Sequence, residues 1–215
     1  MTTSTEKNGS ATISHPRFSA FYKWFSNRRS TRRFTDPYRQ ELAEQAHGVV
    51  LEVGVGAGAN FLFYKPEQIE RLEAVEPDAT MLAYAREQAT QARIPITLSQ
   101  ASVEALPFAD ATFDSVVITL VLCSVQHPAK SMQEIHRVLK PGGSLLLCEH
   151  VRSEGPFNAR LQDMMVPLTV RISGNCHWNR DTEQTVREAG FSPVDLRYLG
   201  RRALQPILIL HAQRT

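Results

Sequence analysis

The stretch VVLEVGVGAGANF, Val49 to Phe61, decides the fold. Its first five residues form a short apolar run rich in valine, which predicts a buried strand of a parallel sheet. Gly54, Gly56 and Gly58 follow at GxGxG spacing, and Glu52 stands just before them. A dinucleotide loop has the spacing GxGxxG, and a P-loop continues into Gly-Lys-Ser/Thr. A carboxylate here would repel a pyrophosphate and suits a ligand that carries a positive amine or sulfonium.

The next informative carboxylate is Glu76, which ends a predicted strand at Arg71 to Val75. Its separation from Glu52 along the chain is close to the roughly 20 residues that lie between such a glycine loop and the acidic residue that binds the ribose hydroxyls. Asp78 is placed to cap the helix that follows, which leaves Glu76 free to bind ribose. The alternative for the glycines is a tight strand–helix turn without a ligand.

Composition narrows the class of protein. The chain has 215 residues and a formal net charge of +2, which fits one globular domain and gives no field that would indicate a nucleic-acid partner. The basic run at 27–33 is interpreted as a solvated face, with a phosphate or membrane-surface patch as the alternative. Cys123, Cys148 and Cys176 match neither a zinc pattern nor a disulfide framework. We therefore expect no metal site and a cytoplasmic location.

Strands and helices alternate along most of the chain. A polar, disordered tail is predicted at 1–15, then an amphipathic helix with aromatic residues from Phe18 to Phe25, and a polar helix near Pro37 to Ala46. Strands are predicted at 49–53, 71–75, 96–98, 115–122, 144–151, 194–198 and 206–213, and helices at 78–92, 127–139 and 181–189, with PGG at 141–143 as a turn. This alternation predicts a doubly wound parallel sheet. The start of the sequence does not resemble a signal peptide, and no apolar run approaches the roughly 20 residues of a membrane span.

The chain resembles the class I S-adenosylmethionine-dependent methyltransferases in a series of stretches that run from about Val49 to Val151: LEVGVGAGANF, EPDATML, ASVEALPFADATFDSVV and EIHRVLKPGGSLLLCEHV. More narrowly, it is similar to the ubiquinone/menaquinone-biosynthesis type. The resemblance implies an α/β, Rossmann-like, doubly wound, mostly parallel seven-stranded sheet with helices on both faces and the last strand antiparallel. It also implies one methyltransferase domain at 16–215, with a helical lid at 16–46 and a substrate-side insertion at 152–182.

The resemblance implies S-adenosyl-L-methionine as the cofactor and S-adenosyl-L-homocysteine as the product. The residues implied to bind the cofactor are Glu52, Gly54, Gly56 and Gly58 at the methionine part, Glu76 at the ribose, Pro77, Met81, Ser102 and Val103 at the adenine, and Thr119 and Leu120 beside the amine and sulfonium. Ser102 replaces the acid usual in the family, and its hydroxyl accepts the same hydrogen bond more weakly. Tyr22 is expected to point from the aromatic helix over the cofactor, with plain packing as the alternative.

A second resemblance concerns the methyl acceptor. TLVLCSVQHP, CEHV and GNCHWNRDT are similar to the animal alkyl-thiol S-methyltransferases and their bacterial relatives, which implies a small thiol, sulfide or lipophilic acceptor. The catalytic candidates are His150 as a base, Glu149 beside it, and His177 in a loop over the substrate pocket. A structural hydrogen bond or simple packing explains each of these residues about equally well.

Several alternatives stay open at this point. One alternative keeps the enzyme class but changes the acceptor to a quinol, phenol or phospholipid that is methylated at oxygen, carbon or nitrogen. Two alternatives come from other classes: a nicotinamide-dependent oxidoreductase and a non-catalytic nucleotide-binding module. GxGxG spacing argues against the oxidoreductase. Near-neutral charge and Thr119 to Leu122 in place of an (Asn/Asp)-Pro-Pro-(Tyr/Phe) motif argue against RNA methylation. The expected partner is a small molecule rather than a nucleic acid, peripheral membrane contact stays open, and no oligomeric state is predicted.

Overall fold

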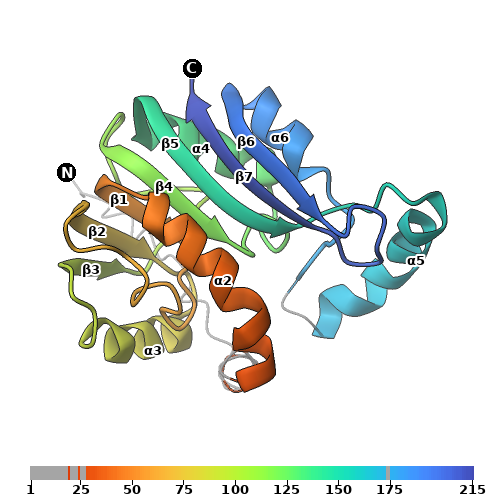
Figure 1. Cartoon of the computed structure of the whole chain (residues 1–215), viewed down its shortest axis with the longest axis horizontal. Coiled ribbons are helices and arrows are strands. Elements are labelled where there is room, and N and C mark those ends of the chain that lie inside the picture. The colour runs from red at the N-terminus through yellow and green to blue at the C-terminus, as the bar shows by residue number, and fades with distance from the viewer. Residues whose placement is uncertain (1–18, 20–23, 25–27, 173–174) are drawn as a thin grey trace, which may run out of the picture.

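The computed structural model describes Ser19, Trp24 and residues 28–172 and 175–215 (Figure 1). The tail at 1–15 and most of the expected aromatic helix, including Tyr22, lie outside the described residues. The elements in chain order are α2 (Arg29–Gln45), β1 (Gly48–Val53), β2 (Ile69–Val75), α3 (Ala79–Ala89), β3 (Ile96–Ser99), β4 (Phe113–Thr119), α4 (Pro128–Val138), β5 (Leu139–His150), α5 (Pro156–Ile172), α6 (Thr182–Glu188), β6 (Phe191–Leu199) and β7 (Ile207–Arg214).

The strands form one seven-stranded sheet in the order β3-β2-β1-β4-β5-β7-β6. β1 pairs in parallel with both β2 and β4, and β4 pairs in parallel with β5. β7 runs antiparallel to both of its neighbours, β5 and β6. The expected Rossmann-like sheet with an antiparallel last strand is therefore confirmed. Because the strand order reverses between β1 and β4, the carboxyl ends of these two strands mark the place where such sheets bind ligands.

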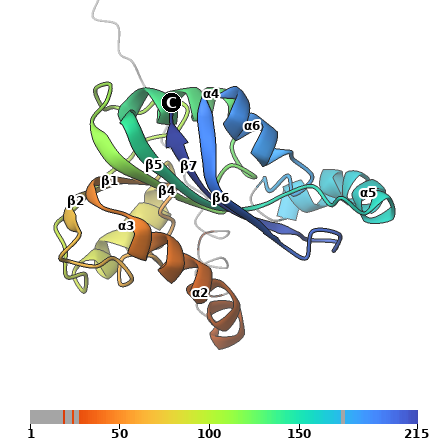
Figure 2. The same cartoon turned by 45° about the horizontal axis from the view of Figure 1, so that its top comes forward.

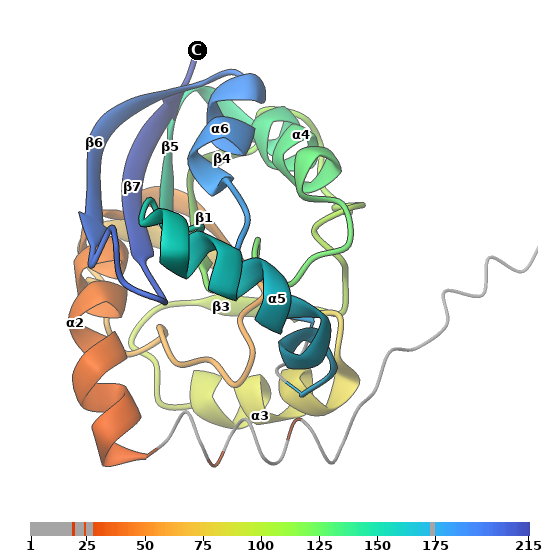
Figure 3. The ribbon, with the colours of Figure 1, turned by 90° about the vertical axis from the view of Figure 1, so that its right-hand side faces the viewer.

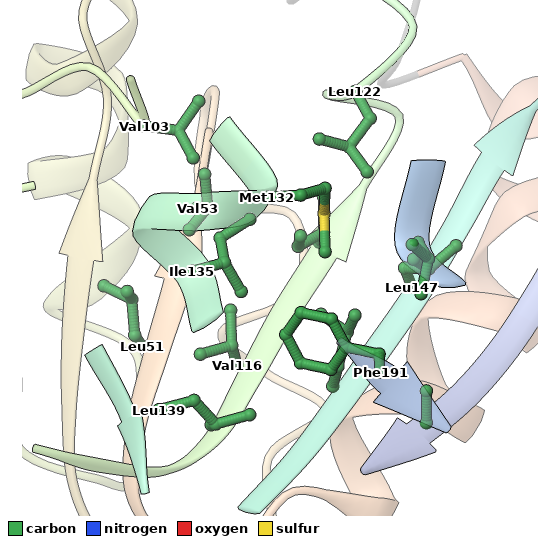
Figure 4. Close-up of a cluster of buried hydrophobic side chains, with 14 of the residues drawn as sticks. Leu51, Val53, Val103, Val116, Leu122, Met132, Ile135, Leu139, Leu147 and Phe191 are labelled. Carbon is green, nitrogen blue, oxygen red and sulfur yellow. The ribbon is translucent and has the colours of Figure 1, made fainter. Parts of the chain in front are cut away.

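Helices cover both faces of the sheet because its central strands are apolar on both faces. Val50, Val117 and Leu146 pack in a cluster with residues of α2 and α3. Their chain neighbours turn to the opposite face and pack against α4 and α6. Figure 3 shows α2 on one side of the sheet and α4 and α6 on the other. Figure 4 shows Met132 and Ile135 of α4 among the side chains of the second cluster. Each fully buried leucine or isoleucine stabilises the fold by about 2 kcal/mol relative to its exposed state.

The polar helix begins earlier than expected. α2 starts at Arg29 and holds Pro37 in its interior, whereas a start near Pro37 was predicted. Proline removes one hydrogen bond to the carbonyl four residues before it. That carbonyl belongs to Arg33, and both residues are exposed, so water can replace the missing donor. The helix therefore continues through the proline, and Arg29, Arg32 and Arg33 of the basic run lie on its first turns.

Two expectations around β4 and β5 are corrected. PGG at 141–143 was predicted as a turn, but it lies within β5 as an irregularity: Phe113 pairs with Leu139 while Ser115 pairs with Ser144. Four residues therefore bulge out of the ladder, with Gly142 at φ +74°. The strand predicted to run to Leu122 ends at Thr119. Leu120 has φ +59°, a left-handed conformation that no strand can continue.

The segment between β5 and α6 carries α5, which projects beyond the end of β5 rather than packing flat on the sheet (Figures 1 and 2). Three large apolar side chains on this helix are exposed, those of Phe157, Met164 and Leu168. In the part of the chain that the structure describes, no helix combines the length and the apolar character needed to cross a membrane.

Candidate active site

Glu76 lies directly after β2, where its carboxylate joins two backbone segments. Its Oε2 accepts a hydrogen bond from the Gly56 N–H at 2.9 Å, and its Oε1 accepts one from the Asp78 N–H at 3.0 Å. Burial raises the pKa of Glu76, and these two backbone bonds oppose that rise without cancelling it. The carboxylate is thus held in a fixed orientation beside the glycine loop. Each oxygen keeps a second lone pair for a ligand hydroxyl.

The three glycines of the loop serve different purposes. A Cβ on Gly54 would lie 2.5 Å from the Val121 side chain, and one on Gly58 would lie 2.6 Å from the Phe61 ring. Close packing within the protein therefore explains both of these glycines. Gly56 has φ +55°, and a Cβ there would meet no atom within 4 Å. The space beside Gly56, next to the Glu76 carboxylate, is therefore open, so the backbone at this position can be approached closely by a ligand.

Glu52 lies under the glycine loop and is almost fully buried. Its carboxylate accepts hydrogen bonds from the Tyr64 hydroxyl at 2.8 Å and from Asn60 Nδ2 at 3.0 Å. Burial raises its pKa to about 7, although both bonds and the charge of Arg39 act in the opposite direction. Arg39 also donates to Asn60 Oδ1 at 2.8 Å. Glu52 is therefore the centre of a buried polar network, and a nearby positive charge stabilises its ionised carboxylate.

The sequence pattern did not identify the partners of Glu52. Asn60 and Tyr64 fall in a segment too short to interpret by periodicity, and Arg39 comes from α2. Asn60 Nδ2 also donates to Thr119 Oγ1 at 3.2 Å. This bond connects the end of β4 to the glycine loop, so Thr119 lies at the same carboxyl edge as Glu52.

The residues expected at the adenine lie at the neighbouring ends of β2 and β3. Pro77 is half-buried and Met81 is buried. Asp78 caps α3 as predicted, because its side chain accepts from the N–H groups of Thr80 and Met81. The Ser19 hydroxyl also donates to Asp78 Oδ1, at 3.1 Å. A residue from the N-terminal region therefore reaches the start of α3, next to Glu76.

Ser102 and Val103 lie just after β3. The Ser102 hydroxyl oxygen accepts a hydrogen bond from the Glu104 N–H at 3.2 Å, and the Val103 side chain is buried. The hydroxyl proton of Ser102 is left to donate outward. Glu104 itself accepts from the N–H groups of Gln126 and His127 at 2.9 and 3.0 Å, so it fixes the start of α4. Contact of Ser102 and Val103 with adenine stays a prediction.

Glu149, one of the catalytic candidates, holds the turn after β4. It is fully buried, and its carboxylate accepts from the N–H groups of Val121 at 2.6 Å, Leu122 at 2.8 Å and Cys123 at 3.2 Å. Burial raises its pKa, while the three backbone bonds lower it without offsetting burial fully. These bonds explain why the chain leaves the sheet at Leu120. The geometry gives Glu149 a positioning role.

His150, the second candidate, lies within a cluster that the sequence spacing concealed. Single ligand-type atoms of Cys123, His150 and Cys176 all lie within 4.8 Å of one another. His150 Nδ1 and Cys176 Sγ are 3.8 Å apart. The hydrogen bond from Cys123 lowers the pKa of the Cys176 thiol, while burial opposes the change. Burial acts to lower the pKa of His150, but the hydrogen bond and charge of Cys123 and the charge of Glu149 together raise it above its usual value. Cys176 is therefore the more easily ionised thiol.

The loop from Asn175 to Arg180 is fastened to the turn after β4. The His177 N–H donates to the Cys123 carbonyl at 2.6 Å, and Asn175 Nδ2 donates to the Ser124 carbonyl at 2.7 Å. The Arg180 guanidinium donates to the Leu122 and Val125 carbonyls. The His177 ring lies against Arg180, with Nδ1 3.2 Å from the guanidinium, rather than in the cysteine cluster. Its catalytic role stays a prediction.

Trp178, in the same loop, has a buried indole. Among the residues that the structure describes, its N–H is the buried side-chain polar group that has no hydrogen-bond partner. Gln162 of α5 anchors the loop from below, because its Nε2 donates to the Trp178 carbonyl at 3.0 Å. The loop is therefore held in a defined conformation by α5 on one side and by the turn after β4 on the other.

Comparisons with known proteins agree with this arrangement. A family model described as a methyltransferase domain matches residues 51–147. Thiol S-methyltransferase TMT1B of Rattus norvegicus is 38% identical over 155 residues, which cover 69% of this chain and 62% of that protein, less than two thirds of its length. Thiol S-methyltransferase TMT1A of Homo sapiens is 31% identical over 186 residues, 78% of this chain and 75% of that protein.

A solved structure shows the same fold. The N-methyltransferase NodS of Bradyrhizobium japonicum, in complex with S-adenosyl-L-homocysteine, superposes with a TM-score of 0.64 over 89% of this chain and 91% of its own, at 17% identity. At that identity the likeness concerns the fold alone. The match of the methyltransferase family model, by contrast, begins at Leu51 and includes the glycine loop. The chain belongs to the class I S-adenosylmethionine-dependent methyltransferases.

Proposed function

We propose that the protein transfers a methyl group from S-adenosyl-L-methionine to a small thiol or to sulfide. The observation that carries the acceptor class is the match to thiol S-methyltransferases at 38% and 31% identity. When bound, the cofactor supplies a methyl group on a positively charged sulfonium. Transfer is an in-line displacement, so the protein has to bring the two sulfur atoms together and align them.

The donor side is built around Glu76 and Gly56. Glu76 accepts hydrogen bonds from both ribose hydroxyls, and Gly56 lets the cofactor approach the backbone closely. Glu52 favours the positive end of the cofactor electrostatically through its buried carboxylate. Ser102, Val103, Pro77 and Met81 form the adenine end. The open space at Gly56 and the orientation of Glu76 support these assignments.

The acceptor side is built from the turn after β4, the end of β5 and the loop from Asn175 to Arg180. A thiol has to lose its proton before its sulfur can attack, because the thiolate is the nucleophile. The cluster of Cys123, His150 and Cys176 is the set of groups at this edge that can interact with such a sulfur. Glu149 and Arg180 keep the cluster in place through the backbone.

Two measurements test the proposal in sequence. Calorimetric titration with S-adenosyl-L-methionine and S-adenosyl-L-homocysteine should show binding in the micromolar range. A methyl-transfer screen across alkyl thiols, sulfide, phenols, quinols and amines should then show turnover with thiols or sulfide. Turnover of a quinol, phenol or amine alone would contradict the thiol assignment while leaving the cofactor assignment intact. No binding of either cofactor form would contradict both.

A further inference from the structure

The cluster of Cys123, His150 and Cys176 brings together three side chains from distant parts of the chain. Cys123 comes from the turn after β4, His150 from the last position of β5, and Cys176 from the loop before α6. Their ligand atoms lie within 4.8 Å of one another. Thiolate sulfur and imidazole nitrogen are the preferred ligands of zinc, and no other chemistry described above requires the three together.

The spacing of the cluster fits tetrahedral coordination. With zinc–sulfur and zinc–nitrogen bonds of about 2.3 and 2.05 Å, a tetrahedral angle places a sulfur ligand about 3.6 Å from a nitrogen ligand. His150 Nδ1 and Cys176 Sγ are 3.8 Å apart, which is close to that value. Because all three ligand atoms lie within 4.8 Å of one another, the Cys123 sulfur would have to move only a short distance toward the other two to complete the coordination.

Hydrogen bonds to the backbone around Cys123 hold the segments that carry these three side chains in place. Glu149 accepts from the Cys123 N–H, and the Cys123 carbonyl accepts from the His177 N–H at 2.6 Å. Arg180 bonds two carbonyls of the same turn. Outer contacts of this kind orient metal ligands in established sites. The two cysteines are therefore presented from loops that are fixed to each other.

The remaining cysteine provides a contrast within the same protein. Cys148 is also buried, but it packs in the apolar cluster with residues of α2 and does not belong to the group of three. It behaves as a small apolar side chain, which is the commonest role of a buried cysteine. Simple packing explains Cys148, whereas it leaves the gathering of two thiols and an imidazole unexplained.

The cluster also adjoins the cofactor loop. Val121, two residues before Cys123, is the side chain that a Cβ on Gly54 would meet at 2.5 Å. The turn that carries Cys123 therefore packs directly on the loop that cradles the methyl donor. A site with three protein ligands leaves one tetrahedral position for an exogenous ligand, as in catalytic rather than structural zinc sites.

We propose that Cys123, His150 and Cys176 bind a Zn²⁺ ion whose fourth position takes the sulfur of the methyl acceptor. The part concerning the acceptor rests on the proposed function, whereas metal binding stands without it. Coordination to Zn²⁺ lowers the pKa of a bound thiol, so the acceptor releases its proton to water and stays bound as a thiolate. Its lone pair then forms the new sulfur–carbon bond to the methyl group. The electron pair of the broken sulfonium–carbon bond goes to the cofactor sulfur, and the neutral thioether leaves the metal.

Metal binding is tested first, on the full chain kept reduced, treated with a chelator and checked by circular dichroism. Titration with Co²⁺ should give one equivalent bound, with the charge-transfer absorption of cobalt–thiolate bonds, and Zn²⁺ should displace it. Cys176→Ser and His150→Asn should each weaken binding by more than about 100-fold, since even outer contacts of metal ligands contribute 10–100-fold. Cys148→Ala is the matched control and should bind like the wild type.

Two results would overturn the metal site: the reduced wild type takes up no Co²⁺ or Zn²⁺, or Cys176→Ser binds as tightly as Cys148→Ala. Thiol methylation at an unchanged rate by metal-free protein would remove the metal from the reaction and leave the proposed function standing. Stoichiometric zinc binding without transfer to any thiol or sulfide would keep the site and overturn the acceptor role together with the proposed function.

Discussion

Glu76 and Glu149 are the same residue type at the same edge of the same sheet, yet their surroundings differ. Glu76 accepts two backbone hydrogen bonds and borders the open space at Gly56. Glu149 accepts three and is fully buried under the turn after β4. A carboxylate that keeps free lone pairs toward open space can bind a ligand, whereas one enclosed by backbone donors shapes the chain. Position at a strand end alone does not separate these roles.

The largest effect is expected from Glu149→Ala, which leaves the N–H groups of Val121, Leu122 and Cys123 without their acceptor. Each unsatisfied buried donor costs about 1–3 kcal/mol, so the free energy of unfolding should fall by about 4 kcal/mol. Glu149→Gln keeps one acceptor oxygen and should lose about half of that. Urea unfolding followed by circular dichroism measures both. An alanine variant that is as stable as the wild type but inactive would instead make Glu149 a catalytic residue.

The second effect should be on ligand binding rather than stability. Glu76→Ala removes a charged acceptor for two ribose hydroxyls, so affinity for S-adenosyl-L-homocysteine should fall by about 100-fold or more. The free energy of unfolding should fall by only about 1–2 kcal/mol, for the two backbone bonds. Glu70→Ala, a substitution of an exposed carboxylate on the same strand, is the matched control. Equal affinities of the two variants in calorimetry would contradict the ribose assignment.

Glu52 stands between these two cases, because it is buried but borders the site of a positive ligand. Its pKa rises from 4.5 to about 7 in the folded protein, so the folded state holds this proton more tightly than the unfolded state. This proton contributes about 3 kcal/mol to the free energy of unfolding. The contribution is fully present below about pH 4.5 and is lost as the pH rises through about 7.

Glu52→Gln cannot ionise, so the difference in unfolding free energy between wild type and variant should change across this pH range. Urea unfolding at a series of pH values from about 5 to 8 measures that difference. Bound S-adenosyl-L-methionine should reduce the change, because its positive charge favours the ionised carboxylate. Parallel pH profiles of the two proteins would show that Glu52 titrates normally.

The proximity of Glu76 to the glycine loop was predictable from sequence because its signals are local. Gly56 and Glu76 lie next to short apolar runs, and the chain order of strand, loop and strand brings them to one edge, whereas their contact with a cofactor stays a prediction. Tertiary partners were not predictable in this way. Asn60 reaches Glu52 from a turn, Arg39 of α2 donates to Asn60, and no periodic pattern marks either residue.

The cluster of two cysteines and a histidine was not predictable from sequence. Cys123, His150 and Cys176 come from three segments whose proximity depends on how the loop before α6 folds back onto the turn after β4. Residue spacing along the chain therefore excluded a metal pattern that the fold permits. Local rules also failed at Pro37 and at PGG, because an exposed helix and a bulge near the start of β5 tolerate residues that usually end an element.

The smallest effect is expected at Asp78, the fourth carboxylate of this edge. The Ser19 hydroxyl donates to Asp78 Oδ1 at 3.1 Å, and the backbone of Asp78 donates to Glu76. If this contact helps to retain the cofactor, Ser19→Ala should speed cofactor dissociation by about fivefold, the equivalent of one hydrogen bond of about 1 kcal/mol. Stopped-flow displacement of S-adenosyl-L-homocysteine measures the rate. Ser30→Ala, in the first turn of α2, is the control. Equal dissociation rates for the two variants would make the Ser19 contact an ordinary packing contact and leave Glu76 as the main determinant of retention.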